Sequence, residues 1–156
     1  MSGVIIPPNV LDEFVRGYLV CALWSTNDQS EPNGGDPLDA NYEISDIDPA
    51  SVAGVTNDCK VFLEKNWEEM QEYAACIVTN PAQGTSWDYA GHDFWLNRNG
   101  HGSGFWDRYL YALGERLSEA ARACKNQDLY VGDDDKLYLM GFETYADIAT
   151  PVEQPK

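Results

Sequence analysis

The residues of this chain best suited to chemistry are its two histidines, His92 and His101. Asp93 and Asp107 lie near them in the sequence, so a metal site or an acid–base pair on this segment is one hypothesis. If the chain turns at Asn99–Gly100 as a hairpin, the histidines lie at its opposite ends, because each strand residue adds about 3.3 Å. We therefore expect a structural cross-strand pair between His92 and Asp107, with no catalytic residue and no metal or cofactor site.

Asn99–Gly100 stands between two aromatic runs, which is a strong sequence signal for a β-hairpin with a type I′ turn. In that register Phe94 pairs with Phe105, and Trp95 covers Gly104 on the facing strand. This predicts a first hairpin over residues 92–107.

Apolar side chains recur with helical periodicity in three segments, at residues 8–24, about 48–75 and 109–125. Asp48 followed by Pro49 is typical of a helix start, with an N-cap and a proline at the first helical position. Alternating apolar residues around an aspartate-rich turn predict a second hairpin at 128–140. The predicted fold is therefore α+β, with a small antiparallel sheet of about four strands built from two hairpins and packed with three helices.

The chain has 156 residues, of which 44% are hydrophobic, and this predicts a single α+β domain over residues 1–156. Within it we expect an acidic loop at about 25–48 and a loosely ordered tail from about 151. The four cysteines are far apart and favour buried thiols over a disulfide or zinc site. No apolar run is long enough to span a bilayer and no signal peptide is evident, so we expect a cytoplasmic protein.

The charge of the chain is strongly acidic, with 10 Lys and Arg against 26 Asp and Glu and a formal net charge of −16. Such a charge repels nucleic acid and anionic membranes and attracts basic surfaces. The acidity is uneven: residues 1–58 have a net charge of −9, residues 59–125 of −2, and residues 126–156 of −5. This distribution predicts an acidic surface mounted on an ordinary core.

The candidate partner-binding residues come from two acidic segments. Glu64, Glu68 and Glu72 follow one another at four-residue spacing, which places them on one face of the predicted helix. An ordinary solvated helix face is the alternative interpretation of that spacing. The full set is Asp28, Asp36, Asp39, Glu43, Asp46 and Asp48 in the loop, and Glu64, Glu68, Glu69 and Glu72 in the helix.

Several motifs resemble a family of small acidic proteins that occur in bacteriophage genomes and related mobile elements. The central one is GHDFWLNRNGHGSGFWDR at residues 91–108, and it is joined by 22–25, 37–42, 114–117 and 128–134. The resemblance covers most of the chain. It brings no established activity and no catalytic residues, but it implies a context in which acidic phage proteins bind host DNA-handling proteins in place of DNA.

These observations lead to a main hypothesis and two alternatives. The main hypothesis is a non-enzymatic phage or mobile-element protein that binds and inhibits a host nucleic-acid-binding protein, as a DNA mimic of the anti-restriction or anti-CRISPR type. The first alternative is a phage accessory or structural protein whose aromatic hairpin, with Trp95 and Trp106, packs against a partner or a second copy as a homodimer. The second is a small enzyme that uses His92 or His101.

Overall fold

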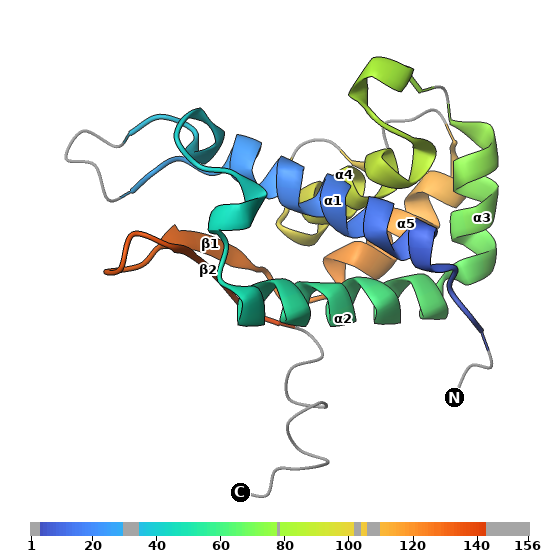
Figure 1. Ribbon diagram of the computed structural model, residues 1–156. Coiled ribbons are helices and arrows are strands. Elements are labelled where there is room, and N and C mark those ends of the chain that lie inside the picture. Colours follow the sequence, from blue (N-terminus) through green and yellow to red (C-terminus); the bar gives the residue numbers. More distant parts are fainter. Residues whose placement is uncertain (1–3, 30–34, 78, 102–103, 106–109, 143–156) are drawn as a thin grey trace, which may run out of the picture.

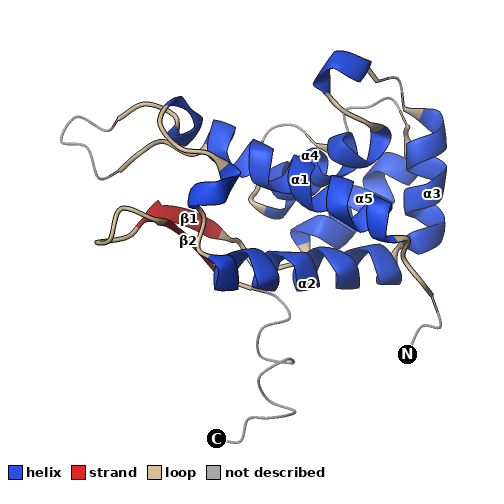
Figure 2. Cartoon of the chain, viewed as in Figure 1, coloured by secondary structure: helices blue, strands red, loops and turns tan. Residues whose placement is uncertain are grey.

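The computed structural model describes residues 4–29, 35–77, 79–101, 104–105 and 110–142. Within them the fold is mixed helix and strand, with five α-helices and one two-stranded antiparallel sheet (Figure 1, Figure 2). The α-helices are α1 (Pro8–Ser25), α2 (Pro49–Lys65), α3 (Trp67–Cys76), α4 (Ser86–Arg98) and α5 (Ala112–Arg122). The strands β1 (Asp128–Val131) and β2 (Leu137–Met140) form the hairpin. The tail expected from about residue 151 lies outside the described residues.

Helix α1 agrees with its prediction and passes through the middle of the fold (Figure 1). It packs most extensively on α4, at a crossing where both helices present a glycine. A Cβ on Gly17 would lie 1.9 Å from the carbonyl oxygen of Asp88, and one on Gly91 would lie 1.9 Å from that of Phe14. The two backbones are therefore in direct contact, which no larger residue would permit.

The predicted first hairpin is wrong, because its first arm belongs to helix α4. Thr85 and Asp88 form a capping box that starts this helix, and Gly100 follows its last turn at a positive φ of 72°. Asn99–Gly100 thus ends a helix and does not join two strands. Helix α4 is buried along nearly all of its second half. It therefore has no polar face there, and the alternation of apolar and polar residues that predicts a helix from sequence is missing.

The predicted helix over about 48–75 is two helices, separated at Asn66. Its start is confirmed, since the side chain of Asp48 accepts a hydrogen bond from the backbone N–H of Ser51 at 3.1 Å. At Asn66 the backbone leaves helical geometry, and the side-chain Nδ2 donates to the carbonyl oxygen of Phe62. Glu64 and Glu68 therefore lie on different helices and do not share one continuous helix face.

The second predicted hairpin is confirmed, with Leu129 opposite Leu139 and Tyr130 opposite Tyr138. It is the whole of the described sheet, which is smaller than the four strands expected. The acidic loop packs against it, because the backbone N–H of Asp48 donates to the carbonyl oxygen of Leu137 at 2.8 Å. Ile47, adjacent in the loop, is buried. The third predicted helix is confirmed in a shorter form, as α5.

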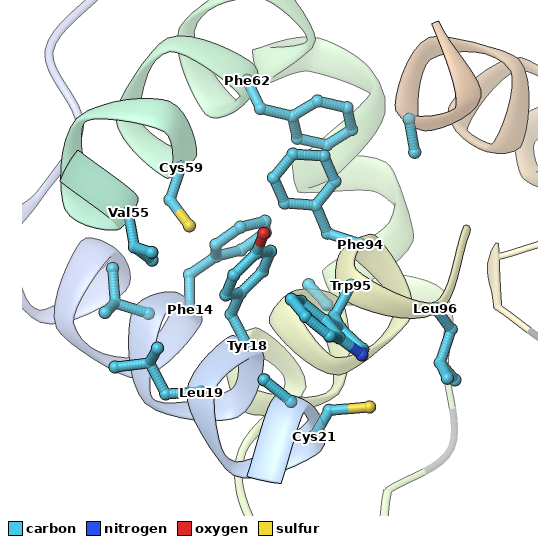
Figure 3. Packing of buried hydrophobic residues seen from close by; sticks show 14 of the residues in the cluster. Phe14, Tyr18, Leu19, Cys21, Val55, Cys59, Phe62, Phe94, Trp95 and Leu96 are labelled. Atoms are coloured by element: carbon cyan, nitrogen blue, oxygen red, sulfur yellow. The ribbon is translucent and has the colours of Figure 1, made fainter. Parts of the chain in front are cut away.

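The hydrophobic core is centred on aromatic rings from α1, α2 and α4 (Figure 3). Phe62 and Phe94 stack with ring centroids 4.1 Å apart, and Phe14 packs beside both. Tyr18 is wholly buried among them. Two of the four cysteines, Cys21 and Cys59, are buried as free thiols, whereas Cys76 is exposed and Cys124 is partly exposed.

A charged side chain is also buried in this core. Arg98, at the end of α4, is 1% exposed and forms an ion pair with Asp58 of α2 at 2.8 Å. Its guanidinium also donates to the hydroxyl of Tyr18 at 3.1 Å and to the carbonyl oxygens of Lys125 and Gly141. One cation therefore joins α1, α2 and α4 to the segments that flank the hairpin.

We expect Arg98→Met to lower the free energy of unfolding by about 3–5 kcal/mol, because it leaves the carboxylate of Asp58 buried without its cation. Adding Asp58→Asn removes that charge, so the double variant should be more stable than Arg98→Met alone. Urea denaturation of the wild type, both single variants and the double variant measures the coupling. Arg116→Met, at an exposed position of α5, is the matched control and should change stability by about 0.5 kcal/mol or less. Strictly additive effects of the two core substitutions would contradict this interpretation.

Candidate functional site

One concave feature of the described surface is a groove of about 640 Å³ between α1, α4 and the turn at 81–84, which we call the α1/α4 groove. Gly17, at the glycine crossing of α1 and α4, is one of its lining residues. Its chemically distinctive lining residues are Arg16, Trp24, Asp39, Gln83, Tyr89 and His92.

One wall of the groove is a bidentate ion pair between α1 and α4. The Nε and second guanidinium nitrogen of Arg16 donate to the two carboxylate oxygens of Asp88 at 2.7 and 2.6 Å. Burial of Asp88 opposes its ionisation, but the hydrogen bonds from Arg16 and Thr85 outweigh it, so the pKa of this carboxyl lies below its usual value. Asp88 therefore both caps α4 and neutralises Arg16.

Two rings occupy the far part of the groove. Trp24 and His92 lie with ring centroids 5.8 Å apart at 34°, and Trp24 keeps 55% of its surface exposed. Behind His92, the buried carboxylate of Asp93 lies 4.0 Å from its Nδ1 and accepts a hydrogen bond from Tyr73. His92 is thus a titratable group facing the groove, as an acid–base role would require.

The arrangement offers little else for catalysis. The described lining residues of the groove include no serine, threonine or cysteine that could serve as a nucleophile. His101 is exposed and does not line the groove. The described part of the chain also brings together no group of three or more His, Cys, Asp or Glu side chains able to hold a metal ion.

A second candidate surface is formed by the acidic loop and the hairpin turn, which lie at the same end of the molecule (Figure 1). The hydroxyl of Tyr42 in the loop donates to Asp135 in the hairpin turn at 2.8 Å. We call this surface the acidic end. The name covers the acidic residues of the two segments, which are Asp36, Asp39, Glu43, Asp46 and Asp48 from the loop, and Asp133, Asp134 and Asp135 from the hairpin turn.

Two tyrosines interact with carboxylates from both the loop and the hairpin turn. The hydrogen bond to Asp135 is the largest influence on Tyr42 and, with burial and the charges of Asp28 and Asp46, raises its pKa to about 12. Tyr138 of the hairpin also has a pKa raised to about 12, chiefly by its hydrogen bond to Asp134 and with a contribution from Asp48. Acidic residues almost 90 positions apart in the sequence therefore act on the same tyrosine.

The predicted partner-binding residues fall into two separate groups. Asp36, Asp39, Glu43, Asp46 and Asp48 belong to the acidic end, together with hairpin acids that were not in the predicted set. The second group consists of the predicted helix acids. Glu64 lies at the other end of α2, which spans about 25 Å at 1.5 Å per residue, and the following helix α3 holds Glu68, Glu69 and Glu72 (Figure 1). Asp28 is only 5% exposed, so its carboxylate is not available to a partner.

The alternative of a structural protein with an aromatic interface requires Trp95 and Trp106 to be accessible to a partner, and Trp95 is not. Trp95 lies in helix α4, is 2% exposed, and donates its indole N–H to Ser25 at 2.8 Å. It therefore packs inside the protein and cannot anchor a partner. The predicted cover of Gly104 is wrong too, since a Cβ there would meet Asn97. Trp106 lies outside the described residues.

The predicted pair between His92 and Asp107 required two paired strands, which the helix α4 excludes. Asp107 itself lies outside the described residues. The sequence analysis did not predict the α1/α4 groove, because its residues come from separate segments and no sequence pattern indicates that these segments lie together. One signal was present: Gly17 and Gly91 inside otherwise apolar segments mark a close helix crossing.

Comparisons with known proteins identify no relative from which a function could be inferred. No protein family model matches the chain, and no curated protein or solved structure matches it either. None of the described helices combines the length and the apolar character needed to cross a membrane.

The ion pair in the groove should make stability depend on pH. Because Asp88 has a lowered pKa in the folded protein, its stabilisation is present above the ordinary carboxyl pKa of 3.8 and is lost as the pH falls through the lowered value. We expect the difference in unfolding free energy between the wild type and Asp88→Asn to narrow from pH 6 to pH 3. Urea denaturation at both pH values measures it, and a difference that stays constant or widens would count against this assignment.

Proposed function

We propose that this protein binds, through its acidic end, a basic surface of a nucleic-acid-binding protein and inhibits it by occupying the place of nucleic acid. The convergence of the acidic loop and the hairpin turn carries this proposal. The resemblance to small acidic phage and mobile-element proteins favours a host protein as the target, of the kind that anti-restriction and anti-CRISPR proteins block.

The charge balance of the acidic end supports this function. Eight carboxylates face one cation, Lys136, among the described residues of the loop at 35–48 and the hairpin turn at 132–136. Exposed like charges at this density repel one another and lower stability, unless a partner neutralises them. A groove lined by Lys and Arg, shaped for phosphates, would supply that neutralisation.

The order of these carboxylates also supports mimicry. Asp46 accepts a hydrogen bond from the backbone N–H of Glu43, and Asp48 caps helix α2. Asp134 accepts from the backbone of Lys136 at 3.1 Å. Side chains held in this way lose little conformational freedom when a partner binds, so more of the electrostatic attraction remains as affinity.

The test is a comparison of two charge-removal variants. Asp36→Asn, Glu43→Gln and Asp133→Asn remove three charges from the acidic end, at positions exposed in the structure. The tagged protein is used to isolate a basic DNA-binding protein from a bacterial lysate, and the purified pair is then studied by calorimetry. We expect the triple variant to bind at least about tenfold more weakly, because each close charge pair contributes to steering and affinity.

The matched control removes three charges at the other end of the molecule, by Glu64→Gln, Glu68→Gln and Glu72→Gln. We expect it to bind within about twofold of the wild type. Binding should weaken steeply between 50 and 500 mM salt, and duplex DNA should compete with the protein. Equal loss in both triple variants, or affinity that is insensitive to salt and DNA, would overturn the proposal.

A further inference from the structure

An exposed indole and an exposed carboxylate both line the α1/α4 groove. Trp24 and Asp39 both line it, and Asp39 comes from the short turn Leu38–Ala40 of the acidic loop. Trp24 keeps 55% of its surface exposed inside a concave site. Tryptophan in such a position is typical of the anchor points of protein interfaces.

The charge of the groove favours a cation as its occupant. Arg16 is the one Lys or Arg among the described lining residues, and its guanidinium is already engaged by both oxygens of Asp88. Asp88, Glu13 and Asp12 all act to raise the pKa of Arg16, so its surroundings are acidic on the α1 side as well. Asp39 adds a further exposed carboxylate.

Among biological cations, arginine fits this pair of groups best. The guanidinium is planar and weakly hydrated, so it stacks on an indole face while it donates two parallel hydrogen bonds to a carboxylate. A lysine ammonium is a strongly hydrated point charge and would use only one of these geometries. The groove volume of about 640 Å³ leaves room for the adjoining backbone of the partner.

We propose that the α1/α4 groove binds an arginine side chain of the partner, with its guanidinium on the indole of Trp24 and paired to the carboxylate of Asp39. This inference rests on the proposed function, since it names one anchor of the basic partner. It adds a specific contact to the diffuse attraction of the acidic end, and it makes recognition depend on an arginine at one position.

The probe is the capped tripeptide acetyl-Gly-Arg-Gly-amide, titrated into ¹⁵N-labelled protein and followed by NMR through the tryptophan indole N–H signals. Trp24→Leu identifies the signal of Trp24 by its disappearance. We expect the Trp24 signal to shift on titration, while that of Trp67, which stacks on Trp87 away from the groove, stays unchanged. The peptide with citrulline, which has the same shape without the charge, should bind at least about fivefold more weakly.

Two aspartate variants separate a specific pair from general acidity. Asp39→Asn should weaken binding of the arginine peptide about three- to tenfold, whereas Asp36→Asn, on the acidic end but outside the groove, should change it less than twofold. The spectra of both variants report whether they remain folded. Equal binding of the citrulline peptide, equal effects of the two variants, or no shift of Trp24 would overturn the inference.

The two proposals can fail separately. If the triple variant of the acidic end no longer binds the partner but the Trp24 signal does not shift with the arginine peptide, only the groove proposal is contradicted. If the arginine peptide binds at Trp24 and Asp39 but partner binding does not depend on the acidic end, the proposed function fails alone.

Discussion

The buried guanidinium of Arg98 is the interaction on which the rest of the fold depends. A buried charged group is tolerated only when its hydrogen-bonding atoms have partners. The partners of this guanidinium are Asp58, Tyr18 and two backbone carbonyl oxygens. These partners come from α1, α2 and the segments before β1 and after β2. The elements must therefore assemble together, and the hairpin is joined to the helical core from both of its ends.

Apolar burial beneath the loop and the hairpin explains how a chain with a net charge of −16 brings part of its acidity to one end. The loop at 35–48 is anchored by buried Leu38 and Ile47, and the hairpin by buried Leu137. The hydrogen bond between Asp48 and Leu137 then brings their acidic turns side by side. Repulsion among the exposed carboxylates is overcome by apolar burial beneath them, so the acidic end persists without a partner.

The contact between α1 and α4 shapes the second surface. Gly17 and Gly91 let the two backbones touch, and the Arg16–Asp88 ion pair fixes the same crossing at its edge. Trp24 is left exposed further along α1, where the short turn Leu38–Ala40 of the acidic loop brings Asp39 to the same groove. The groove and the acidic loop thus share one residue, Asp39.

The sequence by itself determined α1, the start of α2 at Asp48 and the hairpin at 128–140, because local periodicity, caps and turn residues decide such elements. It did not determine α4: a helix buried on nearly all sides has no polar face, and Asn99–Gly100 is equally suited to a hairpin turn or a helix end. Only the tertiary structure decided that the acids of the loop and the hairpin meet while Glu68 and Glu72 lie apart. The physical reason is that the local sequence around a charged residue does not indicate where its side chain lies in the folded protein. That position follows from which apolar surfaces, and which partners of Arg98, are buried together.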